Sequence, residues 1–175
     1  MKKLFLLTAI AGFFAFSGAK AQDAAMSGPK LGIGAEFAFP MGNFGDVSKF
    51  GVGGSLQYQH PIANKLNVTG SAGYLNFQGK DIEGTGLKFA NTGFIPVKAG
   101  LRYFLAENIF VAGELGAAFG TSDGAGTAFA YSPGVGVEFP VADKSTLELS
   151  GRYEGWSNNG TLSFIGLRLA WNFGL

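Results

Sequence analysis

Charged side chains in this sequence stand singly between apolar or small residues, and they are the residues best suited to do chemistry. The set contains four acids and four bases: Glu36, Glu114, Glu138, Glu148, Lys98, Arg102, Arg152 and Arg168. Equal numbers of opposite charges predict mutual neutralisation, because an unpaired buried charge is very costly. The favoured interpretation is a structural ionic network, and the alternative is a pathway for protons or ions.

The elements that carry these charges are predicted to be β-strands. Alternation of apolar and polar residues indicates a strand with two unlike faces. Eight segments show this alternation: 30–39, 50–60, 65–77, 92–105, 108–120, 127–139, 145–154 and 161–173. One face of every segment is free of charge, and the opposite face holds the ionisable residues together with many glycines. The fold class is therefore all-β.

The glycines indicate where the polar face points. Gly contributes 29 of the 175 residues, and a solvated strand face is normally depleted in Gly. The lumen of eight strands, in contrast, has room only for side chains, so small residues and a few paired charges suit it. Aromatic residues of the apolar face gather near both strand ends, as membrane interfaces require. We expect an eight-stranded antiparallel transmembrane β-barrel of up-and-down topology, with its lumen plugged by the ionic network.

The start of the chain resembles an export signal. Residues 1–21 combine a basic start, a 13-residue apolar run and an Ala-x-Ala end, which predicts a cleaved signal peptide. Residues 22–29 are then a short periplasmic segment, and residues 30–175 form the barrel. Short and long connections alternate, which predicts periplasmic turns, outward loops and both termini on the periplasmic side of a Gram-negative outer membrane.

Several function classes are disfavoured by composition. A formal net charge of +1 offers no surface for nucleic acid, and the lack of Cys removes thiolate chemistry. The single histidine, His60, falls at an expected periplasmic turn, the wrong end for a hydrolase of the outer leaflet. Acidic clusters at 81–83 and 122–124 lack calcium-loop spacing. We expect no catalytic site, no cofactor and no metal.

Two further expectations concern residues that fit the barrel less simply. Pro96 and Pro133 lie inside predicted strands, so we expect a β-bulge at each or a strand portion beyond the bilayer. Aromatic residues in or beside the outward loops are candidates either for binding a partner or for extending the outer aromatic girdle. These residues are Phe44, Phe50, Phe89, Phe94 and Trp156.

Three stretches resemble the hairpins of small bacterial outer-membrane β-barrel proteins: 42–58, 65–74 and 100–116. The chain is similar in spacing to eight-stranded barrels of the OmpX and OmpA-transmembrane type, and so to porin-like outer membrane proteins. The resemblance implies a monomer that contacts outer-membrane lipids and lipopolysaccharide. It also implies that the barrel assembly machinery binds the last strand through Trp171 and Phe173. The implied role is structural or interactive at the envelope, with a narrow solute channel or loop-mediated adhesion and ligand binding as alternatives.

Overall fold

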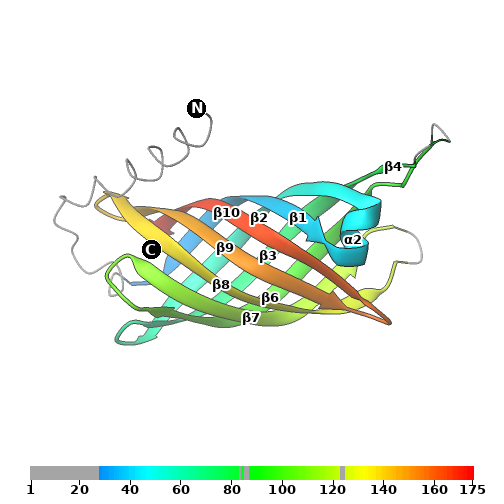
Figure 1. Cartoon of the computed structure of the whole chain (residues 1–175). Helices are drawn as coiled ribbons and strands as arrows, with labels where there is room; N and C mark the ends of the chain where they lie inside the picture. The colour runs from blue at the N-terminus through cyan, green and yellow to red at the C-terminus, as the bar shows by residue number, and fades with distance from the viewer. Residues whose placement is uncertain (1–27, 83, 85–86, 123–124) are drawn as a thin grey trace.

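A computed structural model describes residues 28–82, 84, 87–122 and 125–175. The eight long strands are β1 (Lys30–Met41), β2 (Ser48–Ala63), β3 (Leu66–Gly79), β6 (Thr92–Phe104), β7 (Ile109–Gly120), β8 (Thr127–Ala142), β9 (Ser145–Ser157) and β10 (Thr161–Gly174). Each pairs antiparallel with the next, and β10 pairs with β1 to close the barrel (Figure 1). The eight predicted strands and their up-and-down order are confirmed. The predicted signal peptide at 1–21 lies outside the described residues.

Three short elements lie at one end of the barrel, which we call the loop end. They are the helix α2 (Gly42–Val47) and the hairpin strands β4 (Asp81–Ile82) and β5 (Leu87–Lys88), none of which the alternation predicts. Figure 1 shows the β4 hairpin projecting beyond the barrel rim and the C-terminus at the opposite end, which we call the turn end. No helix in the described part of the chain is long and apolar enough to cross a membrane.

Burial alternates along the strands as the two-faced pattern requires. In β1 the side chains from Lys30 to Phe39 are buried and exposed in strict turn, with the apolar face outside. Aromatic residues of the predicted girdles, such as Phe37, Phe129 and Trp171, are about half exposed on the outer surface. The strands contain 12 to 16 residues, more than the roughly 9–11 that cross a bilayer. The barrel is therefore long enough to span a membrane and to extend past it.

Pro96 and Pro133 are accommodated without a bulge, so the first of the two expected arrangements is wrong, while the other, a strand portion beyond the bilayer, stays a prediction. On β3 and β6, two residues of each strand are unpaired between the pairs Ala72–Val97 and Leu75–Phe94. The register is the same on both sides of this gap. The same happens around Pro133, between β8 and β9. Each proline removes only one N–H, whose hydrogen bond a carbonyl of one neighbouring strand would have accepted. The register shifts of β2–β3 and β8–β9 near the turn end lie instead beside Pro61 and Pro140.

Candidate functional site

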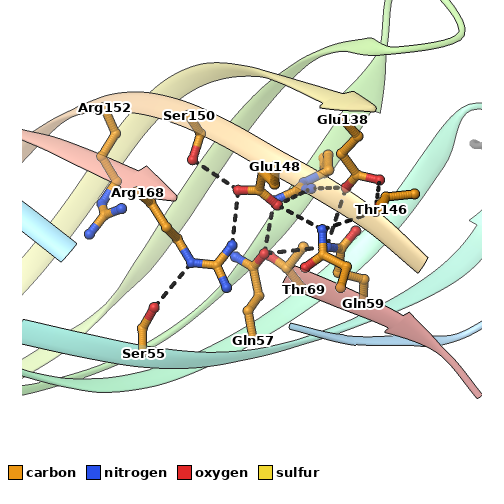
Figure 2. A network of polar contacts seen from close by, with 12 residues as sticks. Ser55, Gln57, Gln59, Thr69, Glu138, Thr146, Glu148, Ser150, Arg152 and Arg168 are labelled. Atoms are coloured by element: carbon orange, nitrogen blue, oxygen red, sulfur yellow. Dashed lines mark hydrogen bonds and ion pairs between the residues drawn. The ribbon is translucent and has the colours of Figure 1, made fainter. Parts of the chain in front are cut away.

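The interior of the barrel gathers all eight ionisable residues predicted from the sequence. Seven of them have no more than 9% of the side chain exposed, and Arg152 has 14%. They project from β1, β6, β7, β8, β9 and β10 into one space, part of which Figure 2 shows. The strand phase alone places them there, because residues of one parity all face inward.

One side of the lumen is crossed by a chain of alternating charges. Glu36 accepts a hydrogen bond of 2.9 Å from Arg152 and lies 3.5 Å from Arg168 Nε. Arg168 lies 3.0 Å from Glu148, which also accepts a 2.9 Å bond from Arg102. Each carboxylate therefore lies between two guanidinium groups, an arrangement that compensates part of the desolvation cost of burial.

The chain continues round the lumen and returns to its start. Arg102 donates to the Gln57 carbonyl at 2.8 Å, and the Gln57 amide donates to Glu114 at 3.1 Å. Lys98 lies 3.2 Å from Glu114 and forms a second, shorter pair with Glu154. Glu154 pairs with Arg152, which closes the circuit. We call this circuit the ionic ring; its members are Glu36, Gln57, Lys98, Arg102, Glu114, Glu148, Arg152, Glu154 and Arg168.

Sequence reasoning missed two charged members of the network, and both lie at the edges of predicted strands. Lys30 donates to Glu138 at 2.8 Å, and Glu138 also pairs with Arg102. Glu154 is the last residue of the predicted segment 145–154 and shares its parity with Arg152. The phase of each strand, applied to its first and last residues, would have found both. With them the network holds five acids and five bases, so it stays neutral.

Inward glycines provide the space for these long side chains. A Cβ added to Gly34 would lie 2.8 Å from Arg168 Nε, and one added to Gly134 would lie 2.8 Å from the Arg152 Cβ. At the turn end a Cβ on Gly136 would overlap the ring of Phe110. The polar face is glycine-rich because arginine side chains and one aromatic ring occupy the volume that other residues would fill.

An aromatic cluster closes the lumen above the ionic ring at the loop end. Phe77 meets Phe44, Phe94 and Phe164 edge-on at ring-centroid distances of 4.8, 6.1 and 5.2 Å. Trp156 packs against Phe94 at 5.0 Å and Phe164 at 4.9 Å, and is fully buried. Its indole N–H donates to Glu154 at 2.9 Å, which links the cluster to the ionic ring.

This cluster corrects the expectation for the loop aromatics. Phe44, Phe94 and Trp156 face the lumen and are at most 8% exposed, so they neither extend an outer girdle nor present a binding surface. Phe50 and Phe89 remain exposed at 38% and 41%. Position near a loop did not reveal which way an aromatic side chain points.

The turn end of the lumen has a smaller apolar layer. Phe104 and Phe110 are buried against each other at 5.8 Å, and the Arg102 guanidinium lies 3.8 Å from the centre of the Phe110 ring. Between the two aromatic layers lie two cavities of about 30 Å³ each, both lined by Gln57, Arg152 and Arg168. A cavity of this size holds about two water molecules.

Other candidate chemistry lies apart from this interior. His60 is exposed near the turn end, where Nδ1 meets the Tyr58 hydroxyl at 3.2 Å. Asp81 of the predicted acidic cluster pairs with Lys49 and Lys88, whose hydrogen bonds lower the pKa of the carboxyl. No group of three or more potential metal ligands occurs within 28–82, 84, 87–122 and 125–175.

Comparison with known proteins relates this architecture to a family. Residues 6–173 match the family model described as outer membrane protein beta-barrel domain. The fold is similar to Ail, the attachment invasion locus protein of Yersinia pestis, with 20% identity, a TM-score of 0.58 and coverage of 85% of this chain and 99% of that one.

Two further solved structures show the same architecture. OprG of Pseudomonas aeruginosa has 12% identity and a TM-score of 0.59, with coverage of 87% of this chain and 98% of that one. Neisserial surface protein A has 15% identity and a TM-score of 0.58, with coverage of 85% of this chain and 98% of that one. No match was found among curated protein sequences. At these identities the likeness is one of fold, and it leaves the role of the interior to be argued from its geometry.

Proposed function

Because the chain belongs to the outer membrane protein beta-barrel family, whose members lie in the bacterial outer membrane, we propose that it is a closed, non-conducting barrel. Its role is structural or interactive at the cell envelope. The observation that carries this proposal is the ionic ring, which spans the lumen between two aromatic layers. Its residues act as a structural plug and not as a path for ions.

The energetics favour a plug over a channel. A migrating ion would have to displace charges that already satisfy one another. Glu36, Glu148 and Glu154 each contact two cations, and Glu114 contacts Lys98 and accepts from Gln57. Removing one partner of a buried pair costs roughly 3–5 kcal/mol. The two cavities of about 30 Å³ are too small for a hydrated solute.

Planar-bilayer recording tests this proposal. The refolded, purified barrel is expected to insert without producing unitary conductance steps, while a porin in the same bilayer serves as the positive control. Insertion is verified by recovering the protein in its folded, heat-modifiable form, whose mobility in electrophoresis changes when the sample is boiled. Sustained unitary conductance would overturn the plug and favour the narrow channel.

A second candidate role, loop-mediated adhesion or ligand binding, is favoured by the projecting hairpin of β4 and β5. Lys80 N–H bonds to the Val47 carbonyl at 2.9 Å, and Lys49 and Lys88 both pair with Asp81, so the hairpin has a defined base. Leu87 on β5 is 64% exposed. The similar structure Ail is described as an attachment invasion locus protein.

Replacing residues 81–88 with a short Gly-Ser turn tests the adhesion role. The variant is expected to keep its heat-modifiable mobility, because the hairpin lies beyond the barrel, and to lose adhesion of expressing cells to host-cell monolayers. Unchanged adhesion in a correctly folded variant would exclude this hairpin as the binding element.

We propose no catalytic role for this barrel. His60 is exposed at the turn end, which lies away from the outer leaflet in the orientation we propose, with the loop end facing outward. Lipid A deacylation by the purified protein, abolished by His60→Ala, would contradict this. We propose a monomer surrounded by outer-membrane lipid and lipopolysaccharide, whose last strand presents Trp171 and Phe173 to the barrel assembly machinery.

A further inference from the structure

The outer wall of the barrel is hollowed where β7, β8, β9 and β10 lie side by side. The groove is shallow and open to the surroundings along its length, with a volume of about 580 Å³. Its outward-facing lining consists of Val111, Pro133, Val135, Gly151, Tyr153 and Ile165. The groove faces the surroundings of the barrel and is separated from the lumen cavities by the sheet.

Small residues in adjacent strands produce this hollow. Gly113 of β7 lies directly opposite Pro133 of β8, and Gly151 of β9 lies opposite Val135. A Cβ on Gly113 would meet nothing within 4 Å, and one on Gly151 would meet only a Leu167 methyl at 3.5 Å. The space over both glycines is therefore open, while Leu115 beside them is 59% exposed.

The groove also contains a backbone acceptor without its ladder donor. In an antiparallel sheet, a residue directs its N–H and C=O toward the same neighbouring strand. Pairing of Pro133 with Gly113 on β7 is intact, whereas pairing with Tyr153 on β9 is missing. The proline nitrogen therefore faces the Tyr153 carbonyl and has no hydrogen to donate. In hydrocarbon such an unsatisfied carbonyl costs several kcal/mol.

Hydroxyl groups lie at the groove's end nearest the loop end. The Tyr153 hydroxyl donates to Ser163 Oγ at 3.0 Å, and the Tyr131 ring covers Gly155 at 6.1 Å from the Tyr153 ring. The groove thus runs from a polar margin on the loop-end side to an apolar floor, the profile of a lipid tail beneath its headgroup.

We propose that this groove is a binding site for one acyl chain of lipopolysaccharide, whose chain hydroxyl donates to the Tyr153 carbonyl. The outer-membrane location supplies a lipid surrounding. The proposal rests on the orientation in which the loop end faces outward, because the polar margin then lies in the outer leaflet. A hydroxylated chain supplies the donor that Pro133 lacks, which an ordinary phospholipid chain cannot. An added protein strand is disfavoured because the closed sheet has no free edge. This proposal does not depend on whether the lumen conducts.

Native mass spectrometry of the refolded full chain in detergent tests the site with two matched probes. The probes are lipid A with hydroxylated chains and a synthetic analogue with plain chains of the same length. We expect the hydroxylated probe to be retained about fivefold better, the scale of one hydrogen bond. Equal retention of both probes, or equal retention of phosphatidylethanolamine, would overturn the proposal.

Four variants locate the site on the wall. Gly151→Leu fills the groove and is expected to weaken lipid A retention about tenfold, the scale of one buried apolar side chain. Gly70→Leu is the matched control, because Gly70 also faces outward with nothing within 4 Å of an added Cβ, but lies on β3.

Pro133→Ala restores the missing N–H and is expected to abolish the preference for hydroxylated chains, whereas Pro96→Ala restores an N–H facing β3 and is expected to preserve it. Heat-modifiable electrophoresis verifies folding of each variant. If Gly151→Leu binds lipid A as well as Gly70→Leu does, or if Pro133→Ala keeps the preference, the site is not this groove.

Discussion

The ionic ring and the aromatic cluster fill the same lumen by opposite means. In the ring, Glu148 and Arg102 are buried because each satisfies the other and further partners. In the cluster, Phe77 is buried by edge-to-face packing with three other rings. Loss of a ring member leaves buried charges with fewer partners, whereas loss of a cluster member leaves a void or an unsatisfied hydrogen bond. The two regions should therefore respond differently to substitution.

The largest expected effect is on the ionic ring. Arg102→Leu removes one cation from both Glu138 and Glu148 while keeping apolar contact with Phe110. We expect a loss of about 4 kcal/mol in the free energy of unfolding, because two buried carboxylates each lose one of their two cations and keep only Lys30 or Arg168. Urea unfolding of the refolded barrel in lipid bilayers measures it. Lys88→Leu, which affects only an exposed pair with Asp81, is the control and should change stability by less than about 1 kcal/mol.

A smaller effect is expected where the two regions meet. Trp156→Phe keeps an aromatic ring in the cluster but removes the N–H that donates to Glu154. A hydrogen bond to a charged group contributes roughly 1.5–3 kcal/mol, so we expect a loss of about 2 kcal/mol in the same unfolding experiment.

Phe164→Leu is the control for that variant, because it changes packing next to Trp156 without removing a hydrogen bond. A loss for Phe164→Leu as large as that for Trp156→Phe would show that the link between cluster and ring contributes no more than packing.

The smallest effect on the barrel is expected from the hairpin outside both regions. Hydrogen bonds from Lys49 and Lys88 lower the pKa of Asp81, so their stabilisation is present above the usual carboxyl pKa of ~3.9 and is lost as pH falls through the lower folded value. Protection of the Ile82 and Leu87 amides from exchange, relative to the intrinsic rate at each pH, should therefore fall in acid, and Asp81→Asn should lower it at neutral pH. Barrel unfolding should stay unchanged, and a change would mean that the hairpin supports the barrel.

The contrast between ring and cluster also explains what the sequence could predict. A charged residue flanked by apolar neighbours, such as Glu114 or Arg168, can face only the lumen of a membrane barrel, so strand phase placed it correctly. Phe94 and Trp156 share the parity of Lys98 and Arg152, so strand phase would also have placed them in the lumen, but the expectation followed their position beside the loops. Lys30 and Glu154 were missed because they lie at the ends of predicted segments, where few alternating residues remain to define the phase.

The alternation of apolar and polar residues also did not predict the short elements or the effect of the prolines. The six residues of α2 lie in a connection predicted as a loop, and the two-residue strands β4 and β5 are too short to show a period. The bulges expected at Pro96 and Pro133 were wrong because one missing N–H interrupts only one side of a strand. The other ladder, with β7, continues through both prolines.

The pairing of Glu36 with Arg168 bears on how the barrel is completed. These residues lie directly opposite each other on β1 and β10, the first and last strands. Until those strands meet, Arg152 and Arg168 lack the carboxylate that both contact, so the half-built sheet carries unmatched charge along its two open margins. Opposite signs on the two margins attract across the gap, and we expect them to draw the final seam into its correct alignment.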